Sequence, residues 1–400
     1  MSEKDLAPGA LPPDGFIPLS VPQLVGNEWK YVKECLDTNW VSSVGSFVDR
    51  FEQTMASYIG CRKAVAMVNG TAALHVALQV VGVQADDEVL VSDLTFIAPV
   101  NAIRYLGAWP VFIDAEADYW QMDPQKVRDF LDKQCLWKDG QLRNKSTGRR
   151  VSAVLPVHIL GHPVDMDPIV ELARKYQLKI IEDATECLGA KYKGRMVGSH
   201  GDLSCFSYNG NKIITTGGGG MIVTDNQAWA DKAKYLTTQA KDDPLEYIHN
   251  EIGYNYRLTN VLAAIGVAQM EKLDEYVAAK RRTAQYYNQQ LGDVAGVRVM
   301  TEAPWAMSTY WMYTVLIDAS KYAMSSRELL RKMAAVGIQT RPLWQPIHAS
   351  PAYKQNAGGD YPVADRLYRD ALSLPCSVGI TEAQLEKVVQ SIRRNLTTKS

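Results

Sequence analysis

A lysine followed by a run of four glycines is the most chemically suggestive feature of this chain. The segment 206–220 (FSYNGNKIITTGGGG) contains Lys212 and several hydroxyl side chains but no acidic residue. Upstream, the apolar segment 178–184 (LKIIEDA) carries Glu182 and Asp183 at its end. A neutral lysine amine captures an aldehyde as a Schiff base, and a carboxylate can hold the proton of a pyridine nitrogen. Together these features predict pyridoxal phosphate chemistry, with Lys212 and Asp183 as catalytic residues.

Each of these residues also has a plainer interpretation. Asp183 could be a helix cap or a Mg²⁺ ligand, but ligands of parallel α/β sheets bind beyond the carboxyl ends of the strands, where it is expected to lie. Glu182 should point to the opposite face of the same strand. Lys212 could be an exposed loop residue, although Phe206 and Ile213 favour burial.

The segment 69–72 (NGTA) is a candidate phosphate site. It lies between an apolar run and an Ala/Leu-rich helical pattern. A glycine-containing turn at a helix N-terminus presents backbone N–H groups and a hydroxyl to an anion. A threonine that only caps the helix is the alternative.

Other familiar constellations are absent from the sequence. The lysine is preceded by Asn211, so no Walker A pattern exists, and no G-x-S-x-G motif occurs. His158 and His162 are four residues apart, as a metal pair on a helix would be, but Gly161 and Pro163 disfavour a helix there. We therefore predict no metal site.

Composition limits the class of protein. A chain of 400 residues can bury one large core and a second, smaller one. The net charge of −1 gives no reason to expect a nucleic acid or an acidic membrane as partner. Six cysteines without zinc-type pairs indicate free thiols in a reducing compartment, so we expect a cytoplasmic protein. No apolar run approaches the roughly 20 residues of a membrane span.

The elements that must position these residues alternate along the chain. Helical periodicity predicts helices at 24–39, 46–59, 72–81, 98–106 and 167–176. Apolar runs predict strands at 64–68, 88–92, 110–113, 151–156 and 179–182. Continuous apolar strands alternating with helices predict an α/β fold, in which a mostly parallel sheet lies between helices.

Two segments interrupt this alternation. The polar segment 133–150 contains Asp139-Gly140, a hairpin signal, and should form a surface excursion. A long helical pattern at 261–288 precedes predicted strands at 297–300 and 310–317 and helices at 326–336 and 382–395. We therefore expect an N-terminal arm (1–15), a large cofactor-binding domain (16–275) and a smaller C-terminal α/β domain (276–400).

Six motifs in their order resemble the DegT/DnrJ/StrS family of nucleotide-sugar aminotransferases, from about Ile17 to the C-terminus. The motifs are WVSS at 40–43, NGTAAL at 69–74, TFIA at 95–98, EDA at 182–184, the segment 206–212, and GYNYR at 253–257. The resemblance implies the fold type I architecture of pyridoxal phosphate enzymes. It also implies a homodimer with active sites shared between the subunits.

The resemblance assigns roles to individual residues. Lys212 would bond the cofactor, Asp183 would pair with the pyridinium nitrogen and Phe96 would stack on the ring. The phosphate would be held by Gly70, Thr71 and Ser207, and by Asn255 of the other subunit. As alternatives, Phe96 could be a core residue and Asn255 a turn residue. Candidate substrate contacts are Trp40, Ser42 and His348, and His348 could equally be a surface or core histidine.

Two positions depart from the family pattern. Glu186 stands where many members have Gln or His, and could accept a hydrogen bond from the cofactor ring hydroxyl. The run 217–220 (GGGG) replaces Gly-Glu-Gly-Gly. Members that carry His in place of the lysine act as dehydratases, so Lys212 favours transamination. L-glutamate would convert the cofactor to pyridoxamine phosphate, which would then aminate a nucleotide-linked keto-sugar.

The sequence defines the sugar substrate less closely than it defines the reaction. The segments 17–22, 26–32 and 182–186 are most similar to the branch that acts on UDP-4-keto-6-deoxy-N-acetylglucosamine, in surface glycan synthesis. The perosamine branch, which uses GDP-4-keto-6-deoxymannose, is the first alternative, and a 3-keto sugar is a further one. Outside this class stand a dehydratase or β-eliminating pyridoxal phosphate enzyme and a non-catalytic scaffold.

Overall fold

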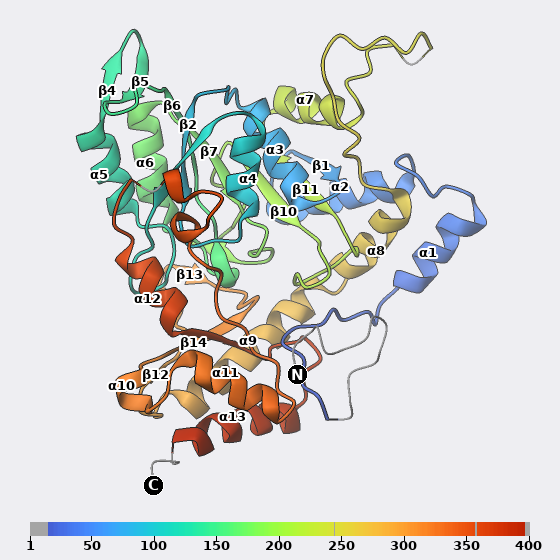
Figure 1. Ribbon diagram of the computed structural model, residues 1–400. Coiled ribbons are helices and arrows are strands. Elements are labelled where there is room, and N and C mark those ends of the chain that lie inside the picture. Colours follow the sequence, from blue (N-terminus) through green and yellow to red (C-terminus); the bar gives the residue numbers. More distant parts are fainter. Residues whose placement is uncertain (1–14, 244, 357, 397–400) are drawn as a thin grey trace.

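A seven-stranded sheet forms the centre of the larger part of the computed structural model, which describes residues 15–243, 245–356 and 358–396 (Figure 1). Its strands, in spatial order, are β1 (Lys63–Met67), β11 (Gly220–Thr224), β10 (Leu203–Ser207), β7 (Lys179–Asp183), β6 (Val151–Leu155), β2 (Glu88–Ser92) and β3 (Trp109–Ile113). The neighbours from β10 to β3 are parallel, and only β11 runs against its neighbours. The predicted mostly parallel sheet is confirmed.

Helices cover both faces of this sheet. The helices of this part are α1 (Glu28–Asp37), which packs against α8, and α2 (Ser46–Ile59), α3 (Gly70–Val80), α4 (Ala98–Tyr105), α5 (Pro124–Gln134), α6 (Met166–Tyr176), α7 (Gln227–Thr237) and α8 (Asn260–Met270). The buried side chains form two clusters. The larger includes Phe51 of α2 and Leu74 of α3, and the smaller includes Leu131 of α5 and Leu172 of α6. The α/β layering predicted from the alternating pattern is therefore present.

A smaller antiparallel sheet lies at the other end of the molecule (Figure 1). It consists of β12 (Val297–Arg298), β14 (Tyr313–Ile317) and β15 (Ala371–Leu374). The accompanying helices are α9 (Leu273–Leu291), α10 (Ala319–Tyr322), α11 (Ser326–Ala335), α12 (Pro362–Asp370) and α13 (Glu382–Leu396). The predicted boundary at 275 falls inside α9 and stays a prediction. Most of the predicted arm (1–15) lies outside the described residues, and Ile17 forms a bridge with Ile338.

The excursion at 133–150 is the hairpin expected from Asp139-Gly140. Its strands are β4 (Cys135–Lys138) and β5 (Gln141–Asn144). Asp139 and Gly140 both have left-handed backbones, with φ of 52° and 72°. Two successive positive φ angles match the twist of the flanking strands. A further small sheet contains β8 (Lys191–Tyr192), β9 (Arg195–Met196) and β13 (Ala306–Met307).

Several predicted elements differ from the structure. The helix expected at 261–288 is divided into α8 and α9 by a turn at Glu271 and Lys272, which no glycine or proline marks. Helix α3 begins at Gly70, because Asn69 is its cap and its side chain accepts the Ala72 N–H at 2.8 Å. The strands β10 and β11, which flank Lys212, were not predicted, nor was α7. In the described part of the chain, no helix is long and apolar enough to cross a membrane.

Glu182 of β7 is completely buried and points away from Asp183, as expected from strand alternation. Its carboxylate accepts hydrogen bonds from the backbone of Gly198, His200 and Gly201, from the Ser204 hydroxyl and from His158 Nε2. Burial alone would raise the pKa of Glu182, but these donors and the nearby histidines outweigh it and hold the pKa at about 2. The role of Glu182 is therefore structural: its carboxylate holds these donors in place.

The Glu182→Gln variant should lose about 3 kcal/mol of unfolding free energy, because it leaves buried donors without an ionised acceptor. Since the folded pKa lies below the ordinary value of 4.5, the stabilisation is complete above that value. It should disappear as the pH falls towards 2, and the variant should lack this pH dependence. Urea unfolding at several pH values measures both effects. Equal stability of both proteins at neutral pH would contradict this role.

Candidate active site

Most of the predicted cofactor residues line one cavity of about 320 Å³ at the carboxyl ends of the parallel strands. The predicted residues that line it are Gly70, Thr71, Phe96, Asp183, Glu186, Ser207 and Lys212. These residues come from four separate segments of the chain, so the fold brings them together. Asn255, Trp40, Ser42 and His348 do not line this cavity.

Lys212 lies in the long connection between β10 and β11, and its side chain is 13% exposed. Its Nζ atom lies 3.3 Å from Glu186 Oε1 and 4.1 Å from the centre of the Trp311 ring. The backbone N–H of Lys212 donates to the Asn209 carbonyl at 2.9 Å, and the Trp311 indole N–H donates to the Asn211 carbonyl at 2.7 Å. These contacts fix the loop around an amine that faces the cavity.

Asp183 ends β7 and is 2% exposed. Burial raises the pKa of its carboxyl, while a hydrogen bond from Thr185 and the charge of Lys212 oppose the increase. Its Oδ1 accepts the Thr185 N–H at 3.1 Å. A carboxylate in so dry a position is poorly stabilised unless a positive group pairs with it. The site can therefore hold a protonated ring nitrogen.

The N-terminus of α3 lines the same cavity. Asn69 accepts the N–H of Ala72 through its side chain and that of Ala73 through its carbonyl. The first N–H groups of a helix have no intrahelical acceptor, so those of Gly70 and Thr71 remain for an anion. A Cβ atom on Gly70 would lie 2.9 Å from the Ser207 Cβ. Only glycine therefore lets the helix start approach Ser207 and the cavity.

The last glycine of the run 217–220 supports this cradle. A Cβ atom on Gly220 would lie 2.4 Å from the backbone carbon and oxygen of Asn69. The second glycine, Gly218, has its first such neighbour only at 4.0 Å, the Val68 carbonyl. Gly217 has a φ of +81°. The run thus serves a left-handed turn at one end and close backbone packing against the helix start at the other.

We expect Gly220→Ala to lower the unfolding free energy by about 1–3 kcal/mol, because the new methyl group overlaps rigid backbone. Displacement of Asn69 should also weaken phosphate binding, so the cofactor dissociation constant should rise. Equilibrium titration with pyridoxal phosphate measures this affinity. Gly218→Ala is the matched control and should leave both quantities unchanged. An unaltered affinity in Gly220→Ala would contradict the proposed cradle.

Glu186 closes the side of the cavity next to Lys212. Its Oε2 accepts the backbone N–H of Leu160 at 2.9 Å, and Leu160 has a left-handed backbone with φ of 61°. Burial raises the pKa of Glu186, and the positive charge of Lys212 opposes this. A strained, buried leucine turn that donates to a carboxylate is a typical feature of functional sites. Sequence reasoning singled out Glu186 but gave no reason to suspect Leu160.

The residues assigned to ring stacking and to a second subunit are exposed. Phe96 lines the cavity and is 55% exposed, so its alternative role as a core residue is wrong. Trp40 is 56% exposed, and Asn255 is also exposed. The carbonyls of Trp40 and Ser42 accept hydrogen bonds from Asn260 at 2.7 and 2.6 Å. Their roles toward a substrate or a partner's cofactor stay predictions.

His348 is held by acidic and aromatic groups outside the cavity. Its Nδ1 lies 2.7 Å from Asp93 Oδ2, and its Nε2 lies 3.3 Å from Asp365. The ring stacks on Tyr361 with centres 4.4 Å apart. Burial raises the pKa of Asp93 to about 6, against the hydrogen bonds from His348. His348 thus links Asp365 of α12 to Asp93 at the end of β2, and its substrate contact stays a prediction.

The two histidines four residues apart, His158 and His162, have protein partners. His158 accepts the Val164 N–H at Nδ1 (2.9 Å), which leaves Nε2–H to donate to Glu182. His162 contacts the Pro163 carbonyl and accepts the Ala303 N–H. Among the described residues, no group of three or more His, Cys, Asp or Glu side chains could hold a metal ion.

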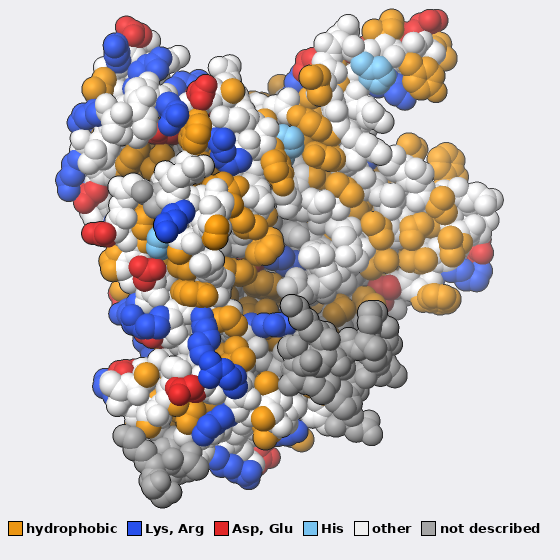
Figure 2. Space-filling model, viewed as in Figure 1, with side chains coloured by type: hydrophobic (Ala, Val, Ile, Leu, Met, Phe, Trp, Pro, Cys, Tyr) orange, Lys and Arg blue, Asp and Glu red, His pale blue; other side chains and the backbone are white. Residues whose placement is uncertain are grey.

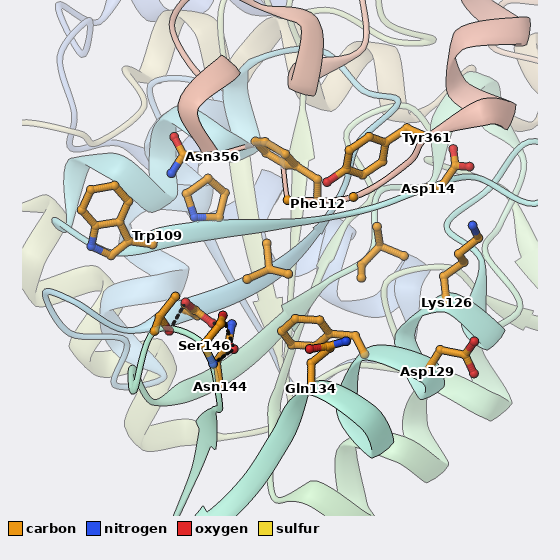
Figure 3. A pocket seen from close by; sticks show the side chains of 18 of the residues that line it. Trp109, Phe112, Asp114, Lys126, Asp129, Gln134, Asn144, Ser146, Asn356 and Tyr361 are labelled. Atoms are coloured by element: carbon orange, nitrogen blue, oxygen red, sulfur yellow. Dashed lines mark hydrogen bonds between the residues drawn. The ribbon is translucent and has the colours of Figure 1, made fainter.

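A larger hollow of about 680 Å³ lies along the edge strand β3, between the α5 and β4–β5 region and the segment that leads to α12 (Figure 3). Trp109, Phe112 and Tyr361 lie on one side of it, and Gln134 and Asn144 on the other. None of the predicted cofactor residues lines it. The candidate active site is therefore the smaller cavity around Lys212.

Sequence reasoning did not identify the aromatic wall. Trp311 and Trp344, both from the smaller part of the molecule, line the Lys212 cavity together with Thr95. They lie far from Lys212 in the sequence and in no motif that contains it. Thr95 is the first residue of the TFIA motif at 95–98, in which only Phe96 was given a role.

Comparisons with known proteins agree with this geometry. A profile of the DegT/DnrJ/EryC1/StrS aminotransferase family matches residues 22–393. The chain is 40% identical over 379 residues to the GDP-perosamine synthase of Caulobacter vibrioides, covering 94% of this chain and 97% of that protein. It is 39% identical over 377 residues to the GDP-perosamine synthase of Escherichia coli O157:H7, covering 94% and 98%. The solved structure of S. venezuelae DesV matches with a TM-score of 0.83 and 29% identity, covering 94% and 95%.

Proposed function

Because the chain belongs to the DegT/DnrJ/EryC1/StrS aminotransferase family and is a pyridoxal phosphate-dependent sugar aminotransferase, we propose that it moves an amino group from L-glutamate to C4 of a nucleotide-linked 4-keto-6-deoxy sugar. The observation that carries this proposal is the convergence of Lys212, Asp183 and the Gly70–Ser207 contact on one cavity. The products are 2-oxoglutarate and the 4-amino sugar.

The residues present fit the cofactor. Gly70 leaves no room for a side chain at the start of α3, which suits a phosphate bound to backbone N–H groups. Asp183 offers a buried carboxylate to the ring nitrogen, and Phe96 offers a ring face beside it. When bound, pyridoxal phosphate supplies a carbonyl carbon that bonds nitrogen and a ring that accepts an electron pair.

Lys212 does the proton chemistry in this proposal. Its Nζ takes the proton from the α-carbon of L-glutamate and returns one to the cofactor side. In the second half-reaction it delivers a proton to C4 of the sugar. Glu186, 3.3 Å from Nζ, orients the amine, and Trp311 lies over it on the side facing the smaller domain. Binding at both ends of the cavity fixes the reacting atoms, which is a large source of rate.

We also propose that the enzyme works as a homodimer with shared sites. Apolar side chains are exposed on the side of the molecule that carries α1 and on the loop after α7 (Figure 2). The larger of them are Val25, Trp29, Leu36, Trp40, Val41, Val44, Leu245, Tyr247, Ile248 and Ile252. Exposed apolar area of this extent supports an interface. Asn255 would then reach the partner's phosphate site. The cytoplasm stays the predicted compartment.

For the sugar, two substrates compete. The identity to two GDP-perosamine synthases, 40% and 39% over nearly the whole chain, supports GDP-4-keto-6-deoxymannose as the first choice. The motifs at 17–22 and 182–186 support UDP-4-keto-6-deoxy-N-acetylglucosamine as the second. This order reverses the preference drawn from the motifs alone, because the relatives match through most of the chain and the motifs cover only a few residues.

The visible spectrum of the purified enzyme tests the function. With pyridoxal phosphate added, we expect a yellow absorption band that L-glutamate removes. Each keto-sugar is then offered to the glutamate-treated enzyme, and the one that restores the band is the substrate. A band that glutamate does not change would contradict the proposed amino donor. Restoration by neither 4-keto sugar would contradict the proposed acceptor class.

A further inference from the structure

The turn at Leu160 and Gly161 joins the two parts of the molecule. Gly161 has a φ of 90°, and a Cβ atom there would lie 2.5 Å from both Thr309 Oγ1 and the Trp311 backbone nitrogen. The Gly161 carbonyl accepts the Thr309 N–H and the Ser308 hydroxyl, both at 2.9 Å. Only glycine therefore fits here, because the backbone is left-handed and the segment from the smaller part of the molecule lies directly against it.

The same turn also reaches the amine of Lys212. The Leu160 N–H donates to Glu186 Oε2 at 2.9 Å, and Glu186 Oε1 lies 3.3 Å from Lys212 Nζ. From the smaller part, the centre of the Trp311 ring lies 4.1 Å from the same Nζ atom, and its indole N–H donates to the Asn211 carbonyl at 2.7 Å. These contacts close a ring that begins and ends at Lys212. This contact ring consists of Lys212, Glu186, Leu160, Gly161, Ser308, Thr309 and Trp311.

The contact ring leaves little room for independent movement of its members. Leu160 is 1% exposed, and its left-handed backbone, with φ of 61°, persists only where the surrounding contacts hold it. A closely packed interior transmits a displacement instead of absorbing it. A shift of the segment 308–311 would therefore move Glu186 and Trp311 together, and both contact the Lys212 amine.

We propose that Gly161 is a positioning residue, which seats the smaller part of the molecule so that Glu186 and Trp311 hold the Lys212 amine in place. Gly161 and Leu160 do not line the Lys212 cavity, so they act through these neighbours. A carboxylate and an aromatic face both attract an ammonium group, so their distances determine its orientation. The inference rests on the proposed function, in which this amine bonds the cofactor and transfers the proton, and it adds how the amine is oriented.

The first test uses the holoenzyme. In Gly161→Ala, the new methyl group overlaps the Trp311 backbone and displaces both contacts of the amine. The rate of the glutamate half-reaction at saturating glutamate should fall about 10- to 100-fold, the loss expected when a reacting group is misplaced by about 1 Å. The cofactor dissociation constant should change less than about twofold. The reason is that Gly70 and Ser207, at the phosphate cradle, lie outside the contact ring.

A second measurement needs neither cofactor nor turnover. Acetic anhydride acetylates lysine amines in the cofactor-free protein, and mass spectrometry gives the rate at each lysine. The ratio of the Lys212 rate to that of the exposed Lys193 corrects for reagent concentration. In Gly161→Ala this ratio should rise about 3- to 10-fold, since the Lys212 amine loses the neighbours that shield it. A purely structural role of Gly161 would leave the ratio in the folded protein unchanged.

Gly296→Ala is the matched control. Gly296 has a φ of 77°, and a Cβ atom there would lie 2.4 Å from the Tyr322 backbone nitrogen, so a similar steric conflict arises outside the contact ring. This variant should lose stability and keep the wild-type labelling ratio and the wild-type rate per folded molecule. If Gly161→Ala fails to fold, Ser308→Ala removes the hydroxyl that donates to the Gly161 carbonyl and should show both effects at about two- to fivefold.

Wild-type labelling and wild-type rate in folded Gly161→Ala, or in Ser308→Ala where that variant replaces it, would overturn the inference. Equal changes in Gly296→Ala would also overturn it, because loss of stability alone would then explain them. A wild-type enzyme that does not respond to L-glutamate would instead contradict the proposed function, and the labelling ratio would still decide the role of Gly161.

Discussion

The Lys212→Ala variant should lose turnover by a factor of about 10⁴ or more, because one side chain both bonds the cofactor and moves the proton. The yellow absorption band of the holoenzyme should disappear with it. Nζ is the amine that lines the cavity, 3.3 Å from Glu186, so no other side chain described there can replace it. Stopped-flow measurement of the glutamate half-reaction, together with the absorption spectrum, checks both parts.

Two further variants make this result specific. Lys212→Arg keeps a cation beside Glu186 but cannot serve as the amine, so it should be as inactive as alanine. Lys193→Ala removes an exposed lysine that pairs with Asp167 and should retain full activity. Circular dichroism should show an intact fold in all three. Wild-type turnover in Lys212→Ala would exclude the proposed mechanism.

The Asp183→Asn variant should lower turnover by a factor of about 10³, the second largest effect. The amide keeps the size of the side chain and can still accept the Thr185 N–H, which is 3.1 Å away. It cannot hold a proton on the ring nitrogen as an ion pair, so the ring is a weaker electron acceptor. The loss should appear in the rates of both half-reactions and much less in the half-saturating glutamate concentration.

Its neighbour gives the matched comparison. Glu182→Gln changes an equally buried carboxyl one residue away, but on the other face of β7, and should lower stability while sparing the rate per folded molecule. A loss of rate in Asp183→Asn together with a loss of stability in Glu182→Gln would support different roles for these two adjacent carboxyl groups of β7. If Asp183→Asn retained the wild-type rate at saturating cofactor, the ring-nitrogen contact would be excluded.

The sequence predicted the sheet better than it predicted the surroundings of the Lys212 loop. Strands such as β2 and β6 contain three successive apolar residues between turns, so their burial leaves a direct signal. The strands flanking Lys212 were missed, because β10 (LSCFS) contains two serines and β11 begins inside a glycine run. Their pairing depends on neighbours distant in the sequence, and no local pattern records it.

The residues of the candidate site could also be predicted only in part. Residues with distinctive chemistry, such as Lys212 and Asp183, could be chosen from the sequence, since their types are rare in apolar surroundings. Trp311 and Trp344 could not, because they reach the Lys212 cavity only through the docking of the smaller part of the molecule against the Lys212 loop. The division between α8 and α9 was missed for a similar reason: Glu271 breaks a continuous pattern while accepting hydrogen bonds from Asn27 and Tyr31.

The reversed strand β11 also determines when the site can form during synthesis. In the described sheet β1 is an edge strand whose neighbour is β11. The pairing of Lys63 with Thr224 therefore cannot form until residue 224 has been synthesised. The helix start at Gly70, which follows β1, gains its neighbour Gly220 in the same step. A nascent chain that ends shortly after Lys212 therefore exposes an unpaired edge and an unfinished phosphate cradle. Such distant pairing makes folding slow, and the open edge is a point at which the emerging chain can aggregate.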